Sequence, residues 1–171
     1  MRNSLYILSQ LDDTDILWLA RVGTATDLAD GASLISAGTP PSNLYIITDG
    51  TLDVNLPDGT SVAQRTIGDV LGEMSLLEKR PPATNVVALG PVRLLAVPLQ
   101  TIRQELDQRP EFAGRFYKAL ALFLSDRLRE ATTARDSSGR KASIELDETM
   151  LDSVHVAGDR LLRLIGMLDG R

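Results

Sequence analysis

The segment from Thr24 to Val97 constrains the fold most, because short apolar runs are separated there by Gly, Pro, Asn and Asp. Such spacing is typical of a β-roll or β-sandwich, in which strands are short and the chain must reverse between them. Proline at 98 then ends the last apolar run, and the pattern changes to helical spacing. We therefore expect a mainly β core with flanking helices.

Three short sequences within this segment carry turn residues. Asp49-Gly50 lies between the apolar run 44–47 and an alternating run that starts at Leu52, a combination that favours a hairpin. Pro57-Asp58-Gly59 predicts a second turn, and Leu89-Gly90-Pro91 predicts a closing hairpin.

Helical signals lie on both sides of the β segment. Asp12 precedes an apolar stretch that reaches Ala20, which predicts a short helix, and the spacing over 99–106 predicts another. A long helix should run from about Pro110 to Ala134, with apolar residues recurring every three or four positions. At about 1.5 Å per residue it would extend close to 40 Å. We expect its apolar face to form a homodimer, the alternative being that this face packs on the β core of its own chain.

The last part of the chain is expected to be separate. Small and polar residues over 136–145 predict a flexible linker, and 146–171 has the pattern of an amphipathic helix. We divide the chain into a β-roll domain over 1–135, this linker and the tail helix. The apolar stripe of the tail could be buried on the roll, on a partner, or as a lid over a pocket.

The composition narrows the possible functions. A net charge of -5 argues against broad attraction to nucleic acid, and the sequence has no cysteine and one histidine, His155. We therefore expect no metal site, no cofactor and no enzymatic activity, because no set of catalytic residues can be recognised. No stretch approaches the roughly 20 apolar residues that span a bilayer, and the N-terminus does not resemble a signal peptide. A cytoplasmic protein is expected.

The most informative stretch runs from Gly68 to Thr84. Gly72 permits close approach of the backbone, and the residues from Glu73 to Leu77 are expected to form a single helical turn. The free N–H groups at the start of that turn suit a phosphate. The Glu73 carboxylate can accept hydrogen bonds from vicinal hydroxyls, so phosphate and ribose could be recognised side by side.

Two motifs in this sequence resemble the cyclic-nucleotide-binding domain family. GlyAspValLeuGlyGluMetSerLeuLeu at 68–77 looks very like the phosphate-binding cassette of the family, and the stretch from Gly38 to Gly50 has its glycine and Leu-Tyr spacing. The family includes the sensor halves of catabolite-activator-type regulators and the regulatory subunits of cyclic-nucleotide-dependent kinases. The resemblance covers about Leu11 to Arg135, and it implies a β-roll that binds a cyclic nucleotide, such as cyclic AMP or cyclic GMP.

The resemblance also implies the residues of a ligand site. Glu73 would meet the ribose 2′-hydroxyl, Gly72, Ser75 and Ala83 would line the sugar-phosphate, and Thr84 would add a hydroxyl. The family's phosphate-binding arginine falls where this chain has Pro82, which offers neither charge nor a backbone N–H. Arg80 could replace it, the alternative being that Arg80 and Lys79 are solvated. The expected ligand-binding residues are Leu71, Gly72, Glu73, Met74, Ser75, Arg80, Ala83 and Thr84.

Two functions follow from these observations. The first is a stand-alone regulatory module that binds a cyclic nucleotide or a related anionic nucleotide and signals by moving its helices. The second is a scaffold for protein interaction or oligomerisation whose pocket has lost its ligand. Direct DNA binding is not expected, because only 36 residues of the 171 follow Arg135, and they contain one helical pattern.

Overall fold

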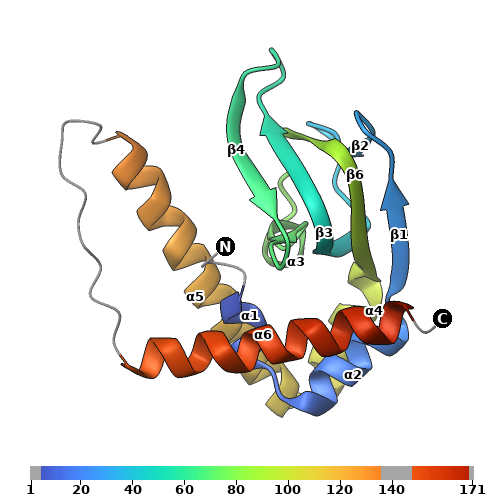
Figure 1. Ribbon diagram of the computed structural model, residues 1–171, viewed down its shortest axis with the longest axis vertical. Coiled ribbons are helices and arrows are strands. Elements are labelled where there is room, and N and C mark those ends of the chain that lie inside the picture. The colour runs from blue at the N-terminus through green and yellow to red at the C-terminus, as the bar shows by residue number, and fades with distance from the viewer. Residues whose placement is uncertain (1–4, 136–147, 170–171) are drawn as a thin grey trace.

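The computed structural model describes residues 5–135 and 148–169. In this part of the chain, six strands form an antiparallel sheet in the order β1-β6-β3-β4, with β2 paired to β6 and β5 paired to β3 (Figure 1). The expected mainly β fold with flanking helices is confirmed. The strands are β1 (Thr24–Leu28), β2 (Ser33–Ile35), β3 (Asn43–Asn55), β4 (Ser61–Thr66), β5 (Val70–Leu71) and β6 (Asn85–Pro98).

Two of the three predicted turns are wrong, because β3 and β6 each continue through them. Gly50 and Gly90 have positive φ angles, and the pairing register of β3 with β6 shifts around Asp49 and Thr51. A Cβ added at Gly50 would lie 2.4 Å from the carbonyl oxygen of Pro91, so the two strands approach closely where both bend. The glycines therefore form bulges that curve two long strands, while the turn at 57–59 connects β3 to β4 as predicted.

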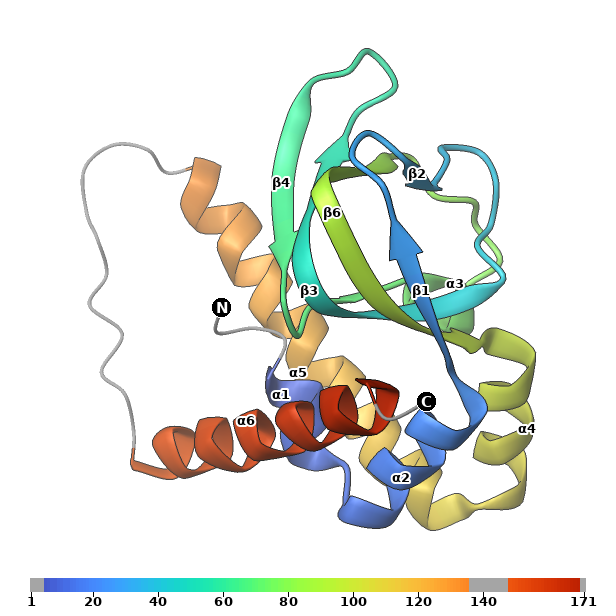
Figure 2. The same cartoon turned by 45° about the vertical axis from the view of Figure 1, so that its right-hand side comes forward.

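The helices gather at one end of the sheet (Figure 2). Those expected near 12–20, 73–77, 99–106 and 110–134 are all present, whereas the N-terminal helix α1 was not anticipated. No helix in residues 5–135 and 148–169 has the length and apolar content needed to cross a membrane. The helices are α1 (Leu5–Gln10), α2 (Asp13–Val22), α3 (Met74–Leu77), α4 (Leu99–Gln108), α5 (Pro110–Arg135) and α6 (Glu148–Asp169).

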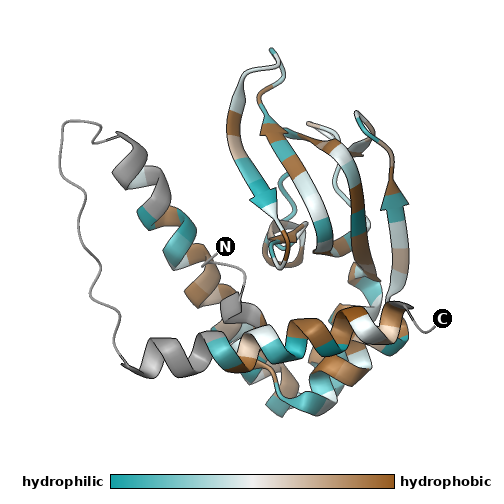
Figure 3. Cartoon of the chain, viewed as in Figure 1, coloured by the Kyte–Doolittle hydropathy of each residue, from teal (hydrophilic) through white to brown (hydrophobic). Residues whose placement is uncertain are grey.

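The tail helix α6 packs on helices of its own chain. Its buried residues Ala157, Leu161, Leu164 and Leu168 belong to one apolar cluster with residues of α1, α2, α4, α5 and the sheet. Figure 3 shows hydrophobic and hydrophilic residues alternating along the described part of α6, as an amphipathic helix requires. The apolar stripe of the tail was expected on the roll, on a partner or as a lid over a pocket. In the structure it is buried against the chain's own helices and sheet. The predicted linker at 136–145 lies outside the described residues.

The apolar face of α5 that was expected to form a dimer is buried in the same cluster. Phe112, Phe116 and Phe123 are at most 1% exposed, and the Phe112 ring lies 5.3 Å from that of Trp18 on α2. The main apolar stripe of α5 is thus covered by its own chain, because residues of α1 and α2 pack with it in this cluster. A dimer needs a different face of α5 and stays a prediction.

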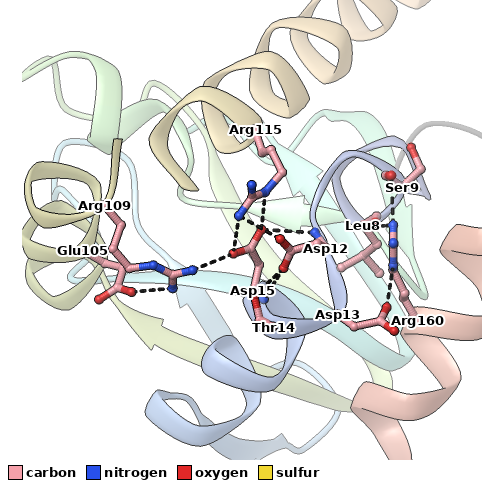
Figure 4. A network of polar contacts seen from close by, with 10 residues as sticks. All are labelled: Leu8, Ser9, Asp12, Asp13, Thr14, Asp15, Glu105, Arg109, Arg115 and Arg160. Atoms are coloured by element: carbon pink, nitrogen blue, oxygen red, sulfur yellow. Dashed lines mark hydrogen bonds and ion pairs between the residues drawn. The ribbon is translucent and has the colours of Figure 1, made fainter. Parts of the chain in front are cut away.

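Ion pairs and hydrogen bonds join the helices to one another (Figure 4). The fully buried Asp15 accepts two hydrogen bonds from Arg115 of α5, at 2.7 and 3.0 Å. Arg160 of α6 donates to the carbonyl oxygens of Leu8 and Ser9 and to the carboxylate of Asp13. These contacts fix α2, α5 and α6 relative to one another.

Candidate functional site

The candidate site is built by the short stretch that follows β5. Gly72 has a φ of +82°, and a Cβ at this position would lie 2.4 Å from the carbonyl oxygen of Asn43. Only glycine fits such a place without strain, because the left-handed conformation and the contact with β3 both exclude a side chain. The chain then turns into α3, the predicted single helical turn, with Glu73 at its start.

Glu73 is the most buried charged group of this stretch, at 2% exposure. Its carboxylate accepts a hydrogen bond from Arg127 of α5, and a second N–H of Arg127 donates to the Val70 carbonyl oxygen at 2.8 Å. The Arg127 guanidinium also lies 4.2 Å from the centre of the Phe123 ring. The long helix is therefore bound to the cassette by a buried ion pair and by a backbone contact.

Burial sets the acidity of Glu73. It raises the pKa of the Glu73 carboxyl, because the charged form is poorly solvated in this position, and the nearby charges of Arg127 and Arg65 only partly offset it. A perturbed carboxyl beside a cavity is a feature of binding sites, although structural ion pairs produce it as well.

A cavity of about 290 Å³ opens beside Glu73. The structure brings all of the predicted site residues to its wall: Leu71, Gly72, Glu73, Met74, Ser75, Arg80, Ala83 and Thr84. Its size is near the lower end of the range for small-molecule sites. Ile35, Val54 and Val86 add apolar surface, so the lining combines apolar and charged side chains.

Pro82 also lines the cavity, and its backbone has a structural role. Its carbonyl oxygen accepts a hydrogen bond of 2.8 Å from the Gly38 N–H, which joins the two motifs that sequence analysis singled out. Asn85 reinforces this junction by accepting a hydrogen bond from the Ala37 N–H. Arg80 is exposed at the rim of the cavity.

Sequence analysis missed two arginines of this site. Arg127 continues the apolar stripe of α5 four residues after Phe123, and a charge within an apolar stripe is the signal that could have found it. Arg65 follows the exposed Gln64 on β4, and its strand register could not be assigned without the structure. Both line the cavity.

A larger groove lies elsewhere on the molecule. It measures about 830 Å³ and is lined by residues of α2, α4 and α6 together with Arg109, and no cassette residue contributes to it. Among the residues that the structure describes, no group of three or more His, Cys, Asp or Glu is placed to hold a metal ion. We therefore take the cavity beside Glu73 as the candidate site, because residues of the cassette line it and the buried charge of Glu73 is among them.

Comparisons with known proteins agree with this geometry. Residues 26–109 match the model of the family described as "Cyclic nucleotide-binding domain". Glutaminase 1 of Bradyrhizobium diazoefficiens is 31% identical over 71% of this chain and 20% of its own length. The CRP-like cAMP-activated global transcriptional regulator of Mycobacterium tuberculosis is 24% identical over 67% of this chain and 53% of its own length.

A solved cyclic nucleotide-binding domain from Methylobacillus flagellatus has the same fold, with a TM-score of 0.71, 20% identity, and coverage of 83% of this chain and 85% of that one. The chain spans between about a fifth and about half of the length of the two curated relatives described above. The β-roll, the cassette geometry and these matches together show that the chain belongs, through residues 26–109, to the cyclic nucleotide-binding domain family.

Proposed function

We propose that this chain is a regulatory module that binds a cyclic nucleotide, or a related anionic nucleotide, in the cavity beside Glu73. The observation that carries the proposal is the convergence of Gly72, Glu73 and Ser75 with Arg127 of the long helix on one cavity. In this proposal the Glu73 carboxylate accepts hydrogen bonds from ribose hydroxyls, and the ligand's base contacts the apolar lining residues. The CRP-like relative carries cyclic AMP activation in its name, which supports this ligand class.

Signalling would follow from the contacts between the cassette and two helices. Arg127 of α5 binds Glu73 and the Val70 carbonyl, while Arg103 of α4 donates to the Ser75 carbonyl. A ligand hydroxyl that binds Glu73 competes with Arg127 for the same carboxylate. Occupancy would therefore shift α5 to the extent that the ligand prefers one helix position over the other.

The proposal includes a homodimer and a cytoplasmic location. On α5, Tyr117 and Leu128 are 48% and 67% exposed and lie on one side of the helix with Ala121 and Leu124, a spacing of four, three and four residues. A second copy of the helix could cover this stripe. Light scattering should then give twice the chain mass of 18.6 kDa at micromolar concentration, and a single-chain mass would remove the dimer from the proposal. A cytoplasmic location suits a sequence without cysteine.

Titration calorimetry with cyclic AMP and cyclic GMP at moderate salt tests the ligand. We expect saturable binding that Glu73→Gln weakens by about tenfold or more, because a charged hydrogen-bond acceptor is lost. Asp107→Asn removes one carboxylate charge from an exposed position on α4 and should leave the affinity unchanged. Near-ultraviolet circular dichroism checks that both variants are folded.

Absence of heat with millimolar ligand and folded protein would reject the sensor. The scaffold function, in which the domain binds a protein partner and the cavity is empty, would then replace it.

A further inference from the structure

Arg65 is a charged residue on the inner face of the roll. It pairs in register with Leu52 of β3, which is fully buried, and cross-strand partners in an antiparallel pair project from the same face of the sheet. The residues before it on β4 agree with this, since Gln64 is exposed and Ala63, on the same face as Arg65, is half-buried. The strand therefore places a guanidinium where a β-roll ordinarily has an apolar side chain.

The charges that line the cavity do not balance. Arg65, Arg80 and Arg127 line it together with two carboxylates, Glu73 and Glu78. Arg127 and Glu73 form an ion pair, and Arg80 and Glu78 are both exposed at the rim. Asp69 is buried nearby, but it does not line the cavity and its carboxylate accepts a hydrogen bond from the Thr66 N–H. Three arginines thus line the cavity with two carboxylates, and Arg65 is the one that projects from β4 on the inner face of the roll.

We propose that Arg65 is the residue that binds the anionic group of the ligand in this cavity. The proposal rests on the proposed function and names a contact that Pro82 cannot make, because proline has no charge and no N–H. The charge of Arg65 already acts on the cavity, since it lowers the pKa of Glu73 against the effect of burial. A guanidinium has five N–H donors, so Arg65 can keep its interaction within the protein and still bind a phosphate.

Binding by Arg65 would give the anionic group of the ligand a defined position. The anion would lie on the β4 side of the cavity, between Arg65 and the glycine turn at 72, while the ribose hydroxyls meet Glu73. Arg80, at the rim, would contribute only long-range attraction, which salt screens. The cavity should therefore distinguish a nucleotide from its uncharged nucleoside through Arg65.

The first test compares affinities for cyclic AMP by calorimetry on the full chain. Arg65→Gln should weaken binding by about 10- to 100-fold, and Arg80→Gln by about twofold or less at moderate salt. Arg21→Gln is the matched control, because it removes the same charge from an exposed position on α2. Unchanged affinity in folded Arg65→Gln, or a larger loss in Arg80→Gln, would overturn the assignment.

The second test measures ligand binding to the wild type alone and uses a variant only to assign an NMR signal. In ¹⁵N NMR spectra of the wild type, the arginine Nε–H signal that Arg65→Lys removes should shift when cyclic AMP is added. Adenosine, which has no phosphate, should leave the signal in place. An equal shift with both compounds, or no shift with saturating cyclic AMP, would show that Arg65 has a structural role only.

Failure of the proposed function can be distinguished from failure of this assignment. If the wild type binds no cyclic nucleotide, inorganic phosphate at millimolar concentration serves as the probe in the same NMR experiment. A shift of the Arg65 signal that saturates would keep Arg65 as an anion-binding residue in a domain with another ligand. No shift with phosphate would overturn it.

Discussion

At the scale of single residues, the buried pair of Glu73 and Arg127 defines the site. Glu73 is buried and Arg127 is partly exposed, and such a pair stabilises a protein only when its geometry is good and the remaining donors are used. Arg127 meets this requirement in part by donating to the Val70 carbonyl and by covering the Phe123 ring. A ligand that competes for Glu73 would therefore disturb three contacts at once.

We expect Arg127→Ala to destabilise the fold in a pH-dependent way. The pKa of Glu73 is raised above its unfolded value of about 4.3, so its contribution to stability is present below that pH and is lost as the pH rises through the folded pKa. Loss of Arg127 raises this pKa further. Urea unfolding should show a small difference from wild type near pH 4 and a difference of about 3 kcal/mol at pH 7.

Arg21→Ala, an exposed arginine of α2, is the control and should behave as wild type at both pH values. A difference for Arg127→Ala that is the same at both pH values would show that Glu73 is not the affected group.

Gly72 is expected to tolerate no side chain. Gly72→Ala should lower the unfolding free energy by at least about 2 kcal/mol, because the methyl group would meet the Asn43 carbonyl and the backbone is left-handed there. Gly114→Ala is the matched change, in α5, where nothing lies within 4 Å of the added atom. It should stabilise the protein by about 1 kcal/mol through helix propensity. Equal effects in thermal unfolding would contradict the conformational argument.

At the scale of elements, α6 behaves as part of the domain and not as an appendage. One face of it joins the apolar cluster, while Val156 and Leu162 are 43% and 68% exposed. The helix packs in the same apolar cluster as α1 and α2. Arg160 of α6 also donates hydrogen bonds to the carbonyl oxygens of Leu8 and Ser9 in α1. Its packing should therefore be visible in the stability of the whole domain.

Substitutions at two leucines of α6, one buried and one exposed, distinguish the packing of this helix from its helix propensity. Leu164→Ala should cost about 2 to 5 kcal/mol, because Leu164 is fully buried and its loss leaves a cavity. Leu162→Ala, two positions away on the exposed side, should change stability by less than about 0.5 kcal/mol. Chemical denaturation measures both. A small cost for Leu164→Ala would mean that α6 does not dock on the domain in solution.

At the scale of the whole molecule, ion pairs to the buried carboxylate of Asp15 hold together helices that lie far apart in the chain. Asp12 and Asp15 form a capping box at the start of α2, in which each side chain accepts a hydrogen bond from the backbone N–H of the other. The Asp15 carboxylate also binds Arg115 of α5. Arg109, at the junction of α4 and α5, makes a longer contact of 3.4 Å to Asp15. One fully buried carboxylate thus orients three helical segments around the end of the sheet.

We expect Arg115→Ala to cost about 3 kcal/mol or more, since Asp15 would lose both hydrogen bonds from Arg115 while it stays buried. Lys118→Ala, an exposed cation on the same helix, should be nearly neutral. Thermal unfolding of the two variants gives the comparison. If Arg115→Ala unfolds like Lys118→Ala, the network does not orient the helices.

Local pattern in the sequence determined much of this protein. Apolar spacing and turn residues were enough for the mainly β core, the long helix and α3, because these depend on periodicity and on residues that follow each other closely. The stretch from Gly68 to Thr84 likewise predicted a set of site residues, all of which line one cavity.

Only the tertiary structure decided what depends on distant contacts. Asp49-Gly50 reads as a hairpin turn, yet pairing with β6 along the whole of β3 makes it a bulge. The apolar stripe of α5 predicts a dimer face, yet α1 and α2, from the N-terminal part of the chain, pack with it in one cluster. Arg65 and Arg127 join the site from β4 and α5, because strand register and helix packing, which local pattern does not encode, set the direction of their side chains.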